Sequence, residues 1–112
     1  MKTTAQGKTA EKAVAAKLRE DGFKILDFNW RRRTCEIDII ARKKKIIYFI
    51  EVKYRRVDDQ GDGFAYLTSR KLTQIRYAAE IWINEYDYHG DYRLLAAAVS
   101  GPNCEEIEVI EL

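Results

Sequence analysis

Proline, histidine and cysteine are scarce in this chain of 112 residues, which contains one, one and two of them, respectively. Two cysteines and one histidine cannot by themselves build a four-ligand structural zinc site. Cys35 and Cys104 could pair only in an oxidising compartment, which nothing in the sequence indicates, so we expect two free thiols. The lone His89 lies in a polar stretch typical of a turn, which argues against a Cys–His nucleophile.

Long apolar runs are also missing. No run could span a bilayer, and the N-terminal stretch MKTTAQGKTAEK lacks the apolar core of a signal peptide. There is no repeat or low-complexity tract, and the length suffices for one hydrophobic core. We therefore expect one domain over residues 1–112, located in the cytoplasm, without a membrane partner.

The net charge of +2 conceals two halves of opposite sign. Residues 1–56 contain 16 Lys and Arg against 7 Asp and Glu, whereas residues 57–112 contain 4 against 11. Basic clusters are typical of proteins that bind polyanions, although lysines at a turn also protect an edge strand, and charge alone leaves both readings open. The candidate nucleic-acid contacts are Arg31, Arg33, Lys43, Lys44, Arg55, Arg56, Arg70 and Lys71.

Apolar residues at three- and four-residue spacing predict helices over residues 4–21 and Thr68–Tyr86. Gly22 stands where a left-handed cap residue would end the first helix. The acidic, glycine-containing residues 57–67 predict a mobile loop. Runs rich in Ile, Phe, Tyr and Val predict strands over Phe23–Arg31, Thr34–Arg42, Lys45–Arg55, Tyr92–Ser100 and Cys104–Leu112. The order αβββαββ predicts an α/β sandwich, a mixed sheet flanked by helices.

Charged residues interrupt the most apolar strand. The run IIYFI continues without a turn signal into Glu51, Val52 and Lys53. Because side chains alternate along a strand, Glu51 and Lys53 are expected on one face and Val52 on the other. Glu36 and Asp38 share a face of the preceding strand by the same rule.

The register of the hairpin decides how these acids meet. If Arg42 lies opposite Lys45, Glu36 faces Glu51 and Asp38 lies diagonally from Glu51. If the register is shifted by two residues, Asp38 faces Glu51 directly. Both registers bring carboxylates together beside Lys53.

Converging carboxylates destabilise a sheet unless a cation compensates them. Mg²⁺ or Mn²⁺ suits Asp38, Glu51 and the backbone carbonyl of Val52, with water and phosphate oxygens completing the coordination. Lys53 could then orient a water or stabilise charge on a phosphate, which is the chemistry of phosphodiester hydrolysis. The alternative is a salt bridge of Lys53 with Glu51 or Asp38. With 10 Glu and 10 Lys, chance predicts about one Glu-x-Lys, so its setting and not its presence favours the metal site.

Further motifs extend over nearly the whole chain: Gly7, Glu11, Gly22-Phe23, Ile25-Leu26, Asn29, Arg31, Glu36–Ala41, Phe49–Lys53, Lys71 and Ala78. Together they resemble the YraN-type family of small bacterial endonuclease-like proteins, within the PD-(D/E)XK restriction-endonuclease-like superfamily. The layout is also similar to that of archaeal Holliday-junction resolvases. The resemblance implies Asp38, Glu51 and Lys53 as the catalytic set and Glu11 as an accessory acid. Two departures are Cys35, where glycine is usual, and the absence of proline before Asp38.

We therefore expect a metal-dependent protein that hydrolyses phosphodiester bonds in DNA rather than RNA, in branched or otherwise structured forms. A homodimer is left open. One alternative is a nucleic-acid-binding module of the same fold without cleavage, and another is a scaffold for protein partners. Intact Asp38, Glu51 and Lys53 favour the first, and the basic N-terminal half disfavours the last. Arg70 and Lys71 stand in the first turn of the second predicted helix, where positive charge opposes the helix dipole. A bound anion would explain this placement, and a tolerated pair of surface charges would explain it about equally well.

Overall fold

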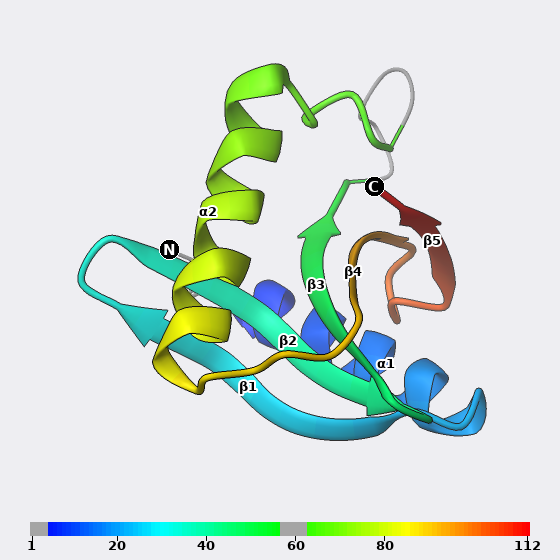
Figure 1. The fold of residues 1–112 in the computed structure, drawn as a ribbon. Coiled ribbons are helices and arrows are strands. Elements are labelled where there is room, and N and C mark those ends of the chain that lie inside the picture. The colour runs from blue at the N-terminus through cyan, green and yellow to red at the C-terminus, as the bar shows by residue number, and fades with distance from the viewer. Residues whose placement is uncertain (1–4, 57–62) are drawn as a thin grey trace.

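The computed structural model describes residues 5–56 and 63–112. These residues form two helices and a five-stranded mixed sheet in the predicted order αβββαββ, a restriction-endonuclease-like arrangement (Figure 1). The predicted loop over residues 57–67 falls largely on residues 57–62, which lie outside the described residues. The elements are α1 (Ala5–Glu20), β1 (Lys24–Arg32), β2 (Cys35–Lys43), β3 (Ile46–Tyr54), α2 (Ser69–Glu85), β4 (Tyr92–Ser100) and β5 (Glu106–Glu111).

Helix α1 ends at a glycine, as predicted. Gly22 has a φ of 93°, which costs a residue without a Cβ little. The Gly22 amide donates to the Arg19 carbonyl (3.0 Å) and the Phe23 amide to the Leu18 carbonyl (2.9 Å). This pair of hydrogen bonds satisfies the last carbonyls of the helix and turns the chain into β1.

The strands lie in the sheet in their sequence order, β1 to β5. Neighbouring strands are antiparallel except for β3 and β4, which are parallel. A parallel pair requires a long crossover, and α2 provides it. Neither described helix is long and apolar enough to cross a membrane.

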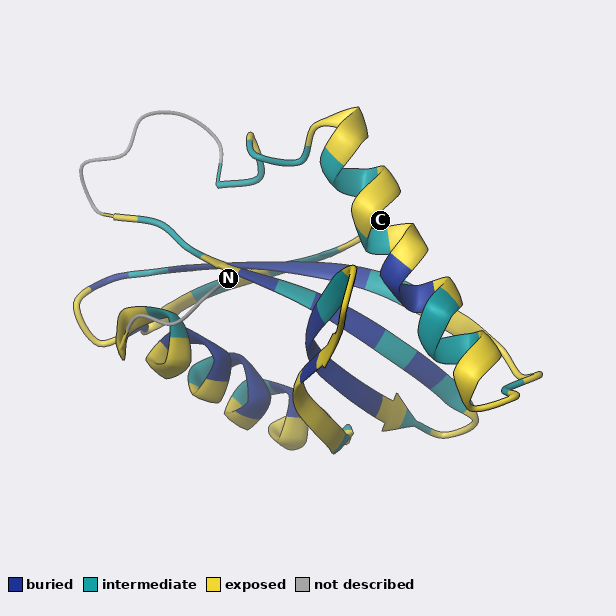
Figure 2. Cartoon of the chain, turned by 90° about the vertical axis from the view of Figure 1, so that its left-hand side faces the viewer, coloured by how far each residue is buried: buried dark blue, intermediate teal, exposed yellow. Residues whose placement is uncertain are grey.

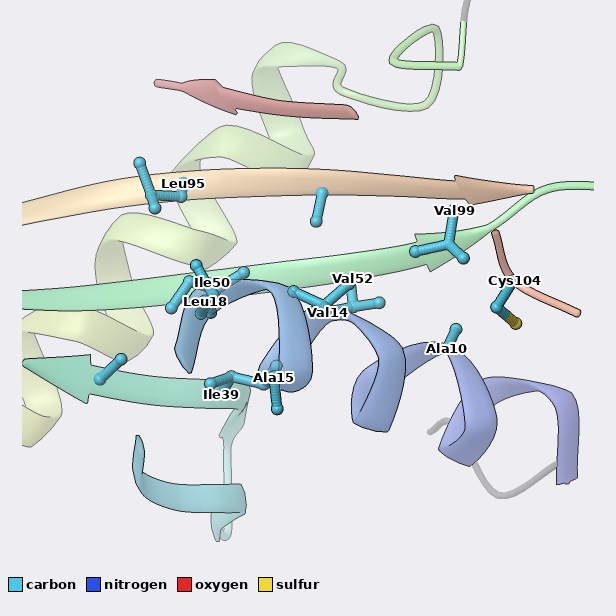
Figure 3. Close-up of a cluster of buried hydrophobic side chains, with 12 residues drawn as sticks. Ala10, Val14, Ala15, Leu18, Ile39, Ile50, Val52, Leu95, Val99 and Cys104 are labelled. Carbon is cyan, nitrogen blue, oxygen red and sulfur yellow. The ribbon is translucent and has the colours of Figure 1, made fainter. Parts of the chain in front are cut away.

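The two helices cover opposite faces of the sheet (Figure 2). Alternating strand residues therefore face different helices: Ile39, Ile50 and Val52 pack with α1 (Figure 3), whereas Ile40 and Phe49 pack with α2. The alternation continues along β3, so that residues of odd number beyond Phe49 point to the α2 side. The sheet thus separates an apolar layer under α1 from a layer under α2 that becomes polar toward the end of β3.

The β2–β3 hairpin fixes the register near the acids. It closes with Lys43 opposite Ile46, so that a two-residue turn begins at Lys44. Lys44 has a φ of 57°, a conformation that such turns require and that Asn or Gly usually supplies. Of the two predicted registers, the one shifted by two residues is correct, and it runs toward Asp38 opposite Glu51.

Candidate active site

A cavity of about 710 Å³ lies between α2 and the face of β2 and β3 that this helix covers. Its size is within the range of roughly 300 to 1,000 Å³ that small-molecule sites occupy. The cavity brings together the three residues predicted as the catalytic set with two others, and these five are Asp38, Glu51, Lys53, Tyr66 and Lys71.

Asp38 stands where β2 and β3 stop pairing. The last paired residues are Ile39 and Ile50, and one step further the Asp38 Oδ2 atom accepts a hydrogen bond of 2.7 Å from the Val52 amide. A carboxylate thus takes the place of a backbone acceptor at the end of the ladder. Asp38 is 2% exposed, so this hydrogen bond holds the carboxylate in one orientation inside the protein.

Glu51 forms an ion pair that the sequence did not predict. Its Oε1 atom lies 3.1 Å from Nζ of Lys71, in the first turn of α2. The Thr68 hydroxyl caps this helix by accepting a hydrogen bond of 3.1 Å from the Lys71 amide, and this bond fixes the position of the Lys71 backbone. The salt-bridge alternative assigned this pairing to Lys53. Among the described residues, the ammonium that contacts Glu51 comes from the helix instead.

Lys53 reaches the cavity from β3, two residues beyond Glu51. Its side chain is exposed, and its Nζ atom lies 5.9 Å from the centre of the Tyr66 ring. A cation at this distance from an aromatic face is weakly attracted to it. The Lys53 ammonium therefore lies at the cavity beside the ring of Tyr66.

Tyr66 is a cavity residue that sequence reasoning missed. It belongs to a turn over residues 63–66 just before α2, and the surrounding glycine and acidic residues indicated only a loop. Its hydroxyl oxygen is buried and has no hydrogen-bond partner in the described part of the chain. Burial raises the pKa of Tyr66 well above its ordinary value, and the charges of Glu51 and Asp38 raise it further. The phenol is therefore neutral and able to donate.

The donors in the cavity fit Mg²⁺ or Mn²⁺. Asp38 and Glu51 offer two carboxylates. Val52 follows Glu51 on β3, and its backbone carbonyl is the third oxygen donor predicted for the ion. One or two carboxylates completed by carbonyl and water oxygens make a typical magnesium site. The Lys71 ammonium already places positive charge against Glu51. Glu36 also lines the cavity, but within the described residues no three His, Cys, Asp or Glu side chains come close enough together to hold an ion.

The basic residues fall at two ends of the sheet. Arg33 lies in the β1–β2 turn beside Thr34, which lines the cavity, and Arg56 follows β3 at the same end. Lys43 and Lys44 lie at the β2–β3 turn. The nine residues of β2 separate the two turns by roughly 30 Å. Residues that cluster in the sequence are therefore not one patch in space.

Three more candidates lie at the cavity end. Arg31 pairs with Glu36 at 3.6 Å. Arg55 is half-buried, and its backbone amide donates to the Val99 carbonyl at 2.8 Å. Arg70 is exposed in the first turn of α2. Arg31 and Arg55 thus have contacts within the protein, while Arg70 extends the positive surface from the sheet to the helix.

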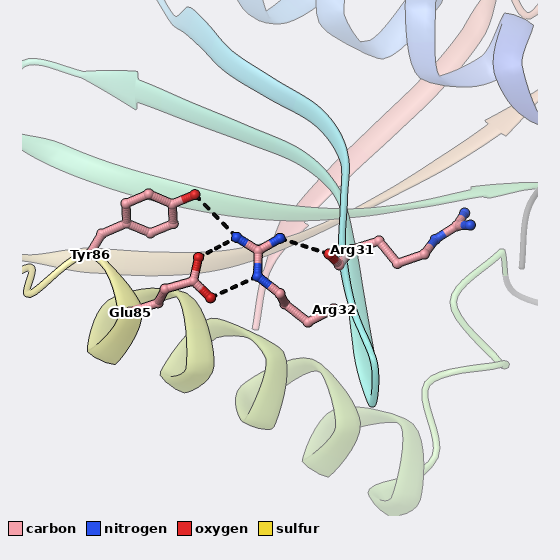
Figure 4. Close-up of polar contacts among 4 residues, drawn as sticks. All are labelled: Arg31, Arg32, Glu85 and Tyr86. Carbon is pink, nitrogen blue, oxygen red and sulfur yellow. Dashed lines mark hydrogen bonds and ion pairs between the residues drawn. The ribbon is translucent and has the colours of Figure 1, made fainter.

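Arg32, in the middle of the run Arg31–Arg33, is held by the end of α2 (Figure 4). Its guanidinium donates to both carboxylate oxygens of Glu85 and to the Tyr86 hydroxyl, and lies 4.4 Å from the centre of the Trp30 ring. The hydrogen bonds from Arg32 lower the pKa of Glu85. Trp30 is 4% exposed and belongs to the core. Arg32 and Trp30 therefore join β1 to α2.

The sequence pattern described as "Uncharacterised protein family UPF0102" matches residues 10–111. The chain belongs to the UPF0102 family. A UPF0102 protein of Fusobacterium nucleatum is 40% identical over 84 residues, which cover 75% of this chain and 69% of the relative. One of Cytophaga hutchinsonii is 35% identical over 104 residues, covering 93% and 89%. One of Sulfurihydrogenibium is 34% identical over 109 residues, covering 96% and 95%. This is the YraN-type family that the sequence motifs resemble.

Cys35, which stands where the resemblance implies a glycine, shows no backbone strain. It begins β2, and it is not among the described non-glycine residues with a positive φ. Burial raises the pKa of its thiol above the ordinary value. Both cysteines are free, as expected, and Cys35 remains a protonated thiol that is a poor nucleophile.

Glu11, the predicted accessory acid of the UPF0102 chain, lies in the other layer. It is 2% exposed on α1, the helix that covers the opposite face of the sheet. It is not among the described residues that line the cavity. Its participation in the chemistry of the cavity stays a prediction.

Proposed function

We propose that this UPF0102 chain is a Mg²⁺- or Mn²⁺-dependent endonuclease that hydrolyses phosphodiester bonds in DNA. The observation that carries the proposal is the convergence of Asp38, Glu51 and Lys53 in one cavity under the start of α2. Two acidic oxygen donors beside an ammonium match the needs of this reaction, in which a cation and a phosphate must be held together. The resemblance to resolvases makes branched or otherwise structured DNA the first substrate to test.

The acidic and basic residues of the cavity have different roles in the proposed reaction. Asp38 is fixed by the Val52 amide, so its carboxylate is oriented before any ligand enters. Glu51 supplies the second carboxylate. In hydrolysis a water oxygen bonds to phosphorus while the bond to the leaving oxygen breaks, and Lys53 stabilises the negative charge that grows on the phosphate. When bound, the divalent cation would supply Lewis-acid stabilisation of the same charge.

A second candidate function is nucleic-acid binding without cleavage. It is favoured by the internal partners of both carboxylates, because Asp38 accepts from the Val52 amide and Glu51 pairs with Lys71. A pair of acids that serves only to join the sheet to α2 would leave the basic surface as the functional part.

A substrate panel separates these functions. Duplex, flap, four-way junction and single-stranded DNA, with matched RNA strands, are incubated with the protein in Mg²⁺ or Mn²⁺, beside an Asp38→Asn control. Cleavage by the wild type alone supports the endonuclease. Binding without cleavage by either protein supports the binding module. Absence of both supports a scaffold for protein partners.

The first expected result concerns the two ends of the sheet. Arg33→Gln should reduce the slope of log affinity against log salt concentration by about one, because one phosphate contact is lost. Lys44→Gln, at the far turn, should change the slope much less. Fluorescence anisotropy with a labelled junction between 50 and 200 mM salt measures both. Equal losses in both variants would mean that the DNA spans the whole sheet.

The second expected result concerns the ion pair at Glu51. Lys71→Met should strengthen Mg²⁺ binding about three- to tenfold, because the ammonium no longer competes for this half-buried carboxylate. Lys71→Arg keeps the charge and serves as the matched control. Calorimetric titration of Mg²⁺ into each protein gives the affinities. A weaker affinity in Lys71→Met would show that the lysine supports the ion site and does not compete with it.

A further inference from the structure

Tyr66 carries a polar atom whose position the described structure leaves unexplained. Its hydroxyl oxygen is buried without a hydrogen-bond partner in the described residues. A hydroxyl buried in this way destabilises the folded protein, so such groups are rare unless they serve a ligand or a reaction. The side chain lines the same cavity as Asp38 and Glu51.

The hydroxyl also leaves the two nearby acceptors unused. Glu51 and Asp38 are close enough to act electrostatically on the phenol, yet its oxygen is not hydrogen-bonded to either carboxylate. If Tyr66 served to satisfy these acids, such a bond would be expected. The carboxylates instead have the Lys71 ammonium and the Val52 amide as partners.

Four of the polar groups that line the cavity form two sets. Asp38 and Glu51 are acceptors suited to a cation. Lys53 and Tyr66 are donors, and they lie beside each other, with the ammonium 5.9 Å from the ring centre. Two neighbouring donors facing a cation site are the arrangement that an oxyanion requires.

We propose that Tyr66 donates a hydrogen bond to a non-bridging oxygen of a phosphate group bound in this cavity. On the proposed function, on which this assignment to a substrate rests, the group is the scissile phosphodiester. A phosphate fits better than a nucleobase, because Lys53 adds positive charge beside the phenol. It also fits better than a water alone, because no carboxylate of the described residues is ion-paired with the Lys53 ammonium, and an anion balances this charge where a water cannot.

The test compares Tyr66→Phe, which removes only the hydroxyl, with Tyr92→Phe. Tyr92 is 40% exposed at the start of β4. It pairs with Ile47 of β3, at the end of that strand away from Glu51 and Lys53. Inorganic phosphate is titrated calorimetrically into each protein loaded with Mg²⁺, and melting temperatures are measured in EDTA. Tyr66→Phe should weaken phosphate binding about tenfold and leave Mg²⁺ affinity unchanged. Its melting temperature should equal or exceed that of the wild type, because no hydrogen bond is lost.

Three outcomes would overturn the assignment: equal phosphate affinity in Tyr66→Phe and the wild type, no phosphate binding by the wild type, or a clearly lower melting temperature of Tyr66→Phe. Single-turnover cleavage adds an independent reading. If the wild type cleaves DNA, Tyr66→Phe should be slower by about 10²-fold, as for other lost oxyanion donors. Equal rates would refute the role of Tyr66 and leave the endonuclease intact. A wild type that binds phosphate through Tyr66 but cleaves nothing would refute only the endonuclease.

Discussion

Replacing Asp38 by asparagine is expected to eliminate cleavage, abolish the stabilisation by Mg²⁺ and raise the melting temperature in EDTA. Two carboxylates in one cavity repel each other when no divalent cation is bound, so neutralising one relieves the repulsion. The asparagine amide oxygen can still accept from the Val52 amide, so the hydrogen bond at the end of the ladder survives. A gain of about 1 kcal/mol corresponds to roughly 4 °C.

Asp38→Ala separates the charge from the hydrogen bond. It relieves the same repulsion but leaves the Val52 amide without its acceptor in a buried place, which costs about 1–3 kcal/mol. We therefore expect the alanine variant to melt below the wild type in EDTA and the asparagine variant above it. Thermal melts of the three proteins, each with EDTA and with Mg²⁺, measure these effects. An asparagine variant less stable in EDTA, with a wild type indifferent to Mg²⁺, would refute the catalytic assignment.

Much of the fold could be predicted because its signals are local. Apolar spacing marks α1, and Gly22 marks its end, since both depend on contacts within a few residues of sequence. The element order αβββαββ followed from the same kind of local pattern. The register of the β2–β3 hairpin needed the structure, because Lys44 adopts a turn conformation that its residue type does not indicate.

The predicted site was incomplete for a different reason. The alternation in β3 placed Glu51 and Lys53 on one face, which requires only the period of a strand. The pairing of Glu51 with Lys71 and the approach of Tyr66 depend on how α2 and the preceding turn pack on the sheet. That packing joins residues 15 to 20 positions apart, and no local pattern encodes it.

The basic surface shows where sequence proximity misleads. A strand that joins two turns carries them to opposite ends, so Arg33 and Lys44 are separated by the length of β2. Arg32 lies between two candidate contacts yet is bound by Glu85 through the folded chain. Charge counting could not distinguish an arginine that holds a helix from one that faces solvent.

The role of Lys53 leads to the other large effect expected. Lys53→Met keeps the length of the side chain and removes its charge, so cleavage should fall by about 10²- to 10³-fold, as when other groups that stabilise developing charge are removed. Mg²⁺ affinity should stay the same or rise, because a positive charge leaves a cavity lined by the carboxylates of Glu36, Asp38 and Glu51. Single-turnover cleavage with a labelled junction and calorimetric Mg²⁺ titration measure the two quantities.

Lys53→Arg is the matched control for charge without the compact ammonium, and it should recover part of the rate. The salt-bridge alternative makes Lys53 a structural partner of Glu51 or Asp38, so it expects a large loss of stability and weaker folding in Lys53→Met. The structure instead pairs Glu51 with Lys71 and leaves the Lys53 side chain exposed beside Tyr66. We therefore expect the Lys53→Met protein to melt within about 2 °C of the wild type, since exposed charges contribute little to stability. A drop of many degrees, with cleavage unchanged in the protein that remains folded, would assign Lys53 to the architecture and remove it from catalysis.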